Sequence, residues 1–99
     1  MKIPKKFKMA NNWITVEIVD SLPNANYGQY NDVKELISIA KTVKVDGEVI
    51  ELSEAQIFTT FWHEFVHCMQ FYFDNSNSEA QAQSYANFLC EMLNTKVDV

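Results

Sequence analysis

The chain has 99 residues, of which 47% are apolar, so it can build one compact core and is expected to be a single domain over residues 1–99. Its two glycines and two prolines exclude collagen-like and loop-dominated classes. The formal net charge is −5, and all eight basic residues are lysines. This charge disfavours nucleic acid and anionic lipid as partners, and the lack of arginine removes the usual bidentate phosphate ligands.

The sequence also carries signals about the compartment. No apolar run approaches the roughly 20 residues of a membrane-spanning helix. The lysines near the N-terminus are followed by mixed polar sequence and not by the apolar core of a signal peptide. Cys68 and Cys90 lie in segments with a helical pattern, which is typical of a reducing compartment. We therefore expect a cytoplasmic protein with no membrane partner.

The first half of the chain has the patterns of β-strands. Residues 13–19 are rich in β-branched side chains and indicate a strand, with residues 7–9 as its expected antiparallel partner. Residues 21–32 collect Pro, Gly, Asn and Asp and indicate a loop. Residues 36–43 indicate a second main strand. The Asp-Gly dipeptide at 46–47 is a hairpin turn signal, which indicates either a short third strand after it or a turn that leads the chain into the helix.

The second half of the chain is helical. Ser53 and Gln56 form a capping-box pattern, and no helix-breaking residue follows before Phe73. The polar segment 74–78 indicates a loop, and a second helix is expected over residues 78–93. This order of elements predicts an α+β domain in which the two helices pack on one face of a small antiparallel sheet.

The first predicted helix carries a His-Glu-x-x-His motif, formed by His63, Glu64 and His67, that includes both histidines of the chain. Positions i and i+4 differ by about 40° around a helix and by one turn along it, so both imidazoles can bind one metal ion. Glu64 then reaches water bound to the ion, and it can take a proton from that water and return it to a leaving amine. This is the signature of the zincin metallopeptidases. The alternative is a pair of surface histidines beside a solvated glutamate.

A catalytic zinc site needs three protein ligands and a water molecule. The positions three and six residues after His67, which hold Gly and His in the metzincins, are Gln70 and Phe73 here. No third histidine exists, so the third ligand must be a carboxylate if a single chain forms the site. The candidates that follow the motif are Asp74, Glu79 and Glu91. Glu79 is favoured because it lies in the first turn of the second helix, after a loop that can reverse the chain.

Glu79 has a second interpretation, because residues Ser76 to Glu79 form a capping-box pattern and the carboxylate could simply cap its helix. Ala82 and Ala86 share the helical face of Glu79 and would let the second helix approach the first closely. Gln83, one turn after Glu79, could hydrogen-bond the free edge of a metal ligand, although a solvated glutamine is the alternative.

Other residues with reactive side chains are weaker candidates. Four phenols could donate to an oxyanion, and the sequence assigns none of them: Tyr27, Tyr30, Tyr72 and Tyr85. Cys68 lies about 100° around the helix from His67, so we expect a buried apolar role for it and not metal ligation.

Residues 53–93 resemble the small gluzincin-type metallopeptidases, namely the minigluzincins and the ImmA/IrrE-like proteins of phages and mobile elements. The shared pattern is the motif at His63, Glu64 and His67, followed on the next helix by Glu79, Ala82, Tyr85, Ala86 and Leu89. The resemblance implies one Zn²⁺ per chain held by His63, His67 and Glu79, with Glu64 as general base. It also implies a peptide substrate bound as an extended strand against a sheet edge.

The expected function is therefore that of a zinc metalloendopeptidase, in the host cytoplasm if the protein is phage-encoded. The alternative is a non-catalytic zinc-binding interaction module of a phage or mobile element. Glu64 distinguishes the two, because a structural zinc site needs no carboxylate there and usually closes its fourth position with Cys or His. The substrate and the oligomeric state are left open by the sequence.

Overall fold

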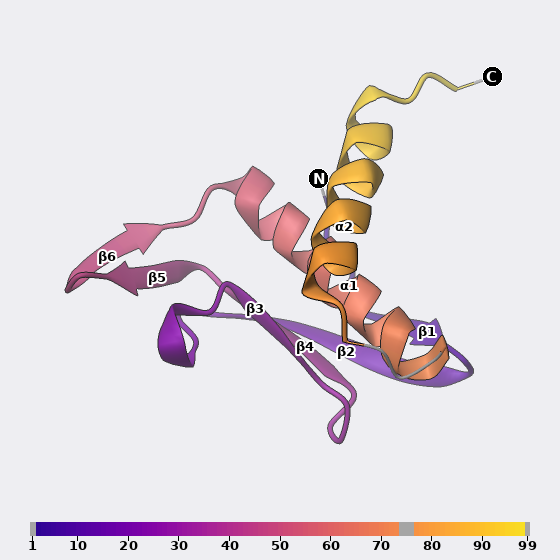
Figure 1. The fold of residues 1–99 in the computed structure, drawn as a ribbon, viewed down its shortest axis with the longest axis horizontal. Helices are drawn as coiled ribbons and strands as arrows, with labels where there is room; N and C mark the ends of the chain where they lie inside the picture. The colour runs from indigo at the N-terminus through magenta and orange to yellow at the C-terminus, as the bar shows by residue number, and fades with distance from the viewer. Residues whose placement is uncertain (1, 74–76, 99) are drawn as a thin grey trace.

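The computed structural model describes residues 2–73 and 77–98. Within these ranges the chain is α+β, as predicted, with strands followed by two helices (Figure 1). The elements are β1 (Lys6–Met9), β2 (Asn12–Val19), a 3-10 turn η1 (Pro23–Ala25), β3 (Gly28–Asn31), β4 (Leu36–Ala40), β5 (Thr42–Val45), β6 (Glu48–Glu51), α1 (Glu54–Phe73) and α2 (Glu79–Thr95). Among the described residues, no helix combines the length and apolarity needed to cross a bilayer.

The main sheet has the strand order β1-β2-β4-β3. Strands β1 and β2 pair antiparallel, as predicted, with Phe7 opposite Ile14. Strands β2 and β4 are parallel, with Val16 opposite Ile37, so the sheet is mixed and the expectation of a wholly antiparallel sheet is wrong at this pair. The reason is that the chain first runs to the outer edge as β3 and then turns back, which inserts β4 between β3 and β2 in the direction of β2.

Strand β3 lies inside the segment 21–32, which was predicted to be a loop. The turn-forming residues do make the 3-10 turn η1, but the residues after it pair antiparallel with β4. The side chain of Asn31 accepts hydrogen bonds from the N–H groups of Val33 and Lys34 and forms the turn into β4. The ring of Tyr30 packs 6.1 Å from that of Phe71 on α1. Pairing and packing therefore hold this polar strand, although its own β-propensity is low.

The segment 36–43, predicted as one strand, is divided between β4 and β5 at Lys41. The carbonyl of Lys41 accepts a hydrogen bond from the N–H of Leu52, so the chain leaves the main sheet there. Strands β5 and β6 form a separate hairpin, which projects from the body in Figure 1. Its turn is the predicted Asp46-Gly47 dipeptide, and both residues have the positive φ that such a turn requires.

Helix α1 packs against the sheet, and α2 packs mainly on α1. The core between the sheet and α1 consists of apolar side chains that are at most 2% exposed: Ile14, Ile37, Ile39, Phe61 and Cys68. The capping box at the start of α1 is confirmed, because the N–H of Gln56 donates to Ser53 Oγ and the N–H of Ser53 donates to Gln56 Oε1. The motif helix is therefore fixed at its N-terminus and along its length.

The start of α2 differs from the predicted capping box. The N-cap is Ser78, whose Oγ accepts a hydrogen bond from the N–H of Gln81, so Glu79 is the first residue of the helix. Ser76 and Asp74, as well as most of the predicted loop, lie outside the described residues. With Ser78 as the cap, the carboxylate of Glu79 is free for another role.

Candidate metal centre

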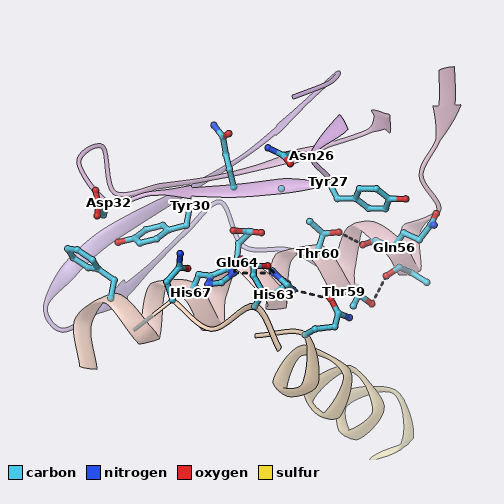
Figure 2. Close-up of a pocket in the computed structure, with 17 residues that line it drawn as sticks. Asn26, Tyr27, Tyr30, Asp32, Gln56, Thr59, Thr60, His63, Glu64 and His67 are labelled. Atoms are coloured by element: carbon cyan, nitrogen blue, oxygen red, sulfur yellow. Dashed lines mark hydrogen bonds and ion pairs between the residues drawn. The ribbon is translucent and has the colours of Figure 1, made fainter. Parts of the chain in front are cut away.

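Helix α1 presents the motif residues to one side. Because His63 and His67 are one turn apart, their Nε2 atoms lie 3.2 Å from each other. Figure 2 shows His63, Glu64 and His67 projecting from the helix beneath the strand that carries Tyr30. The backbone geometry of one uninterrupted helix therefore brings the two imidazoles together, as the spacing predicts.

Helix α2 brings Glu79 to the two histidines. Its Oε1 lies 2.8 Å from His67 Nε2, and its Oε2 lies 3.1 Å from His63 Nε2. Ala82 and Ala86, both fully buried, form the contact face of α2, which allows the close approach that the sequence predicts. Among the described residues, Glu79 is the carboxylate that meets the histidines, and Glu91 is exposed farther along α2. The third candidate, Asp74, lies outside the described residues.

The three side chains form a group that could hold a metal ion, with their ligand atoms within 4.8 Å of one another. Tetrahedral coordination with bonds of about 2.0–2.2 Å would separate ligand atoms by roughly 3.3–3.6 Å. The two Nε2 atoms, 3.2 Å apart, lie just below that range, and each has a different oxygen of Glu79 closer still, at 3.1 Å for His63 and 2.8 Å for His67. Two imidazole nitrogens and a carboxylate oxygen suit a transition-metal ion, so the residues fit such a group by both spacing and chemistry.

A glutamine contacts the outer edge of each imidazole. Gln83 Oε1 lies 3.1 Å from His63 Nδ1, the contact that the sequence analysis considered. Gln70 Oε1 lies 2.9 Å from His67 Nδ1, and sequence reasoning missed this residue. One feature of the sequence could have indicated this contact: Gln70 is a polar residue, three positions after His67, on a helix whose neighbouring faces are apolar. These contacts occupy the Nδ1 edges and leave both Nε2 atoms for a metal.

Glu64 is buried on α1, with 7% of its surface exposed. Burial raises the pKa of this carboxyl above its usual range, while His63 and His67 act in the opposite direction. The carboxyl therefore has a larger tendency to hold a proton than an exposed glutamate.

Gly28 on β3 allows the sheet edge to lie directly over Glu64. A Cβ atom at this position would stand 2.6 Å from Thr60 Cγ2 and 3.1 Å from Glu64 Cγ. Real Cβ atoms do not approach side chains this closely, so only glycine permits the observed distance between β3 and α1. Sequence reasoning missed this role, because Gly28 was counted among the loop residues.

A groove with a volume of about 940 Å³ surrounds the three candidate ligands and Glu64. It lies between β3, α1 and the first turns of α2, and Figure 2 shows Tyr27 and Tyr30 on its sheet side. The charged residues that line it, within the part of the chain that the structure describes, are acidic: Asp32, Glu64 and Glu79. The candidate metal ligands are thus in an open groove and not in a closed structural site.

The other candidates are placed as follows. Cys68 is fully buried, and burial raises the pKa of its thiol, which disfavours the thiolate that a metal would need. Tyr72 donates a hydrogen bond to Glu35, and the hydroxyl of Tyr30 is buried without a partner among the described residues. Burial also raises the pKa of the Tyr30 hydroxyl. Tyr27 lines the groove with its ring about half exposed.

Comparison with known proteins identifies no relative of this chain. No protein-family model, no curated protein and no solved structure matches it.

Proposed function

We propose that the protein is a zinc-dependent metalloendopeptidase in which His63, His67 and Glu79 hold Zn²⁺ and Glu64 is the general base. The observation that carries the proposal is the convergence of three ligand atoms beside a buried carboxylate in one open groove. A structural zinc site would need neither the carboxylate nor the groove. This favours catalysis over the alternative of a zinc-binding interaction module.

Zn²⁺ bound by this donor set would supply a Lewis acid that polarises a peptide carbonyl and acidifies a water molecule. Glu64 is the residue that would take the proton from that water and pass it to the amine that leaves. Its burial raises its pKa, so it holds this proton more readily than an exposed carboxylate between the two transfers. The glutamines at the Nδ1 edges keep the two imidazoles oriented throughout.

A peptide substrate is supported by the edge of β3. The N–H of Ala40 donates to the carbonyl of Tyr27, so residue 27 points its backbone groups toward β4. Orientation alternates along an antiparallel pair, and Gly28 and Tyr30 therefore turn their N–H and C=O groups to the free edge. These groups are spaced as an extended peptide requires for pairing. A bound strand would thus run past Glu64.

The proposal is tested with the Glu64→Gln variant, which keeps the shape of the side chain and removes the base. Both proteins should contain about one zinc per chain by elemental analysis. The wild type should cleave a library of unstructured peptides, and Glu64→Gln should cleave them about 10²–10⁴ times more slowly. Equal cleavage by both proteins contradicts the proposed role of Glu64. Stoichiometric zinc without cleavage by either protein would support the interaction module.

A further inference from the structure

We propose that Asp32 and the rings of Tyr30 and Phe71 form a subsite for a basic side chain of the bound peptide, and for arginine above all. This inference rests on the proposed function and deepens it, because it names the class of peptide that the groove would select. The three residues are specificity-determining: they lie away from the candidate metal ligands and would contact a side chain of the peptide.

The subsite lies at one end of the groove. Gly28 on β3 lies over Glu64 on α1. Two residues later on β3, the ring of Tyr30 lies 6.1 Å from that of Phe71, which is seven residues after Glu64 on the helix. Strand and helix therefore run in the same direction along the groove. Asp32 follows the strand, and Figure 2 shows it at the same end of the groove as Tyr30.

The walls of this subsite are aromatic. Tyr30 and Phe71 are both partly buried, and their rings meet edge to face with an interplanar angle of 65°. The hydroxyl oxygen of Tyr30 is buried, so the part of this side chain that the groove meets is its ring. Aromatic walls accommodate the apolar stem of a long side chain, and the rings attract a positive charge at its tip.

Asp32 supplies a negative charge beside these walls. Its side chain is exposed, and it belongs to the turn between β3 and β4. Asn31 accepts hydrogen bonds from the N–H groups of Val33 and Lys34, which fixes the turn around Asp32. Lys34 is not among the described residues that line the groove. A basic side chain that enters along the rings therefore meets a carboxylate and no lining cation within the described part of the chain.

The combination of rings and a carboxylate favours arginine among the basic residues. A guanidinium group is planar, so it can stack on an aromatic ring and pair with both oxygens of a carboxylate. Lysine would bring the same charge as a compact, more strongly hydrated ammonium group. Leucine would contact the rings but leave Asp32 without a partner, and glutamate would be repelled by it. We therefore expect the order Arg, Lys, Leu, Glu.

The register of β3 determines the position of the basic residue in the peptide. A strand on the free edge of β3 has one residue opposite Gly28 and, two positions along, one opposite Tyr30. Residues two apart in a strand share a face, and Gly28 and Tyr30 both face α1. The residue opposite Gly28 passes Glu64 and would flank the bond that is cleaved. The basic residue is therefore the second or third from that bond.

The first test measures binding without cleavage, with zinc-loaded Glu64→Gln as the protein. Its ligands are short unstructured fluorescent peptides that differ only in one residue, which is Arg, Leu or Glu. By fluorescence anisotropy the Arg peptide should bind about 3–20 times more tightly than the Leu peptide, and the Glu peptide more weakly than both. Equal binding of the three peptides, including no binding of any, would overturn the proposal.

Variants of Asp32 in the same protein identify the charge that carries this preference. Asp32→Asn should lower the ratio of Arg to Leu binding by about 2–5-fold, and Asp32→Lys should make the Glu peptide bind more tightly than the Arg peptide. Asp46→Asn, at an exposed aspartate in the β5–β6 turn, is the matched control and should keep the preference. An unchanged preference in Asp32→Asn and Asp32→Lys would overturn the role of Asp32.

Phe71→Leu tests the aromatic wall, because it keeps an apolar side chain and removes the ring. The ratio of Arg to Leu binding should fall by about 2–5-fold. An undiminished ratio would contradict the contribution of the ring.

Cleavage of a peptide library by the wild type locates the subsite. Arginine should be enriched at the second or third residue from the cleaved bond, on one side of it, and enrichment only at the two residues that flank the bond would contradict the proposed register. A binding preference that depends on Asp32 without any cleavage would support the subsite and contradict the peptidase. Cleavage without a preference for arginine would do the reverse.

Discussion

The two helices contribute to the site in different ways. The groups on α1 are enclosed by the fold, with Glu64 7% and Gln70 4% exposed. The groups on α2 lie at the surface, and the side chain of Glu79 is 73% exposed. Buried groups are held by packing whether or not an ion is bound, whereas Glu79 depends on its contacts with the histidines. Changes to the enclosed groups of α1 should therefore alter both the fold and the site, and changes to Glu79 should alter the site alone.

The largest effect expected from this difference concerns His67 and Glu79. Replacing either residue with Ala should weaken zinc binding by more than 10–100-fold, which is the loss typical when a residue that only hydrogen-bonds a metal ligand is removed. In metal-free protein, His67→Ala should also lower the free energy of unfolding by about 1–3 kcal/mol, because it leaves the buried Gln70 Oε1 without a partner. Glu79→Ala should leave the free energy of unfolding of the metal-free protein unchanged. Urea unfolding in the presence of a chelator measures this free energy for both variants.

Glu91→Ala is the control for the surface helix, because Glu91 is an exposed carboxylate on α2 that does not contact the histidines. It should change neither zinc binding nor stability. If Glu79→Ala destabilised the metal-free protein as much as His67→Ala, the contrast between the two helices would be wrong.

Gly28→Ala should have the next largest effect. The added Cβ would meet Thr60 and Glu64, so β3 must move away from α1, at a cost of about 1–3 kcal/mol in the free energy of unfolding. Peptide cleavage should fall with it, because the strand edge no longer lies over Glu64. Chemical denaturation and a cleavage assay at saturating zinc measure the two effects.

Gly47→Ala is the matched control for that substitution. Gly47 has a φ of +82° in the β5–β6 turn, and nothing lies within 4 Å of an added Cβ. The cost should be roughly 1–2 kcal/mol from backbone strain, with no change in cleavage by the folded protein. Equal losses of cleavage in both variants would indicate a general effect of stability and not of the groove.

The smallest effect is a pH dependence. Because burial raises the pKa of Glu64 in the folded state, that state binds the proton more tightly than the unfolded state does. Its contribution to the free energy of unfolding therefore falls as pH rises above the ordinary glutamate value of 4.5. Metal-free Glu64→Gln should therefore be more stable than wild type at pH 7, because it buries no charge at this position.

Below about pH 4 the carboxyl is protonated in both states, so this difference should disappear. Unfolding curves at several pH values in chelator test it. A stability difference that grew toward acid pH would contradict a raised pKa for Glu64.

The parts of the molecule that could be predicted from sequence are those encoded by local spacing. The helix around His63 and His67 is predicted by its capping box and by the lack of helix-breaking residues before Phe73. Glu79 is predicted as a ligand because it follows a loop long enough to bring the chain back to that helix. Strand β3 could not be predicted, since its residues resemble a loop and become a strand only by pairing with β4. The parallel β2–β4 pair arises from the same insertion.

Gln70 and Gly28 were missed for a related reason. The role of Gln70 depends on where the cap of α2 docks, and that of Gly28 on how closely β3 crosses Glu64. Both are contacts between segments whose relative position no local pattern specifies. The candidate metal ligands could thus be predicted from the sequence, whereas the groups packed around them could not.

The free edge of β3 has one more consequence, for what can associate with it. Unpaired strand edges are ready templates for aggregation, because any exposed edge of another sheet can pair with them. Here the edge opens into a groove whose other walls are α1 and the start of α2. A strand already embedded in a sheet would bring its neighbours against those walls, whereas an isolated extended segment would not. If the proposed function holds, we therefore expect the groove to pair with single extended segments in preference to strands that are already part of a folded sheet.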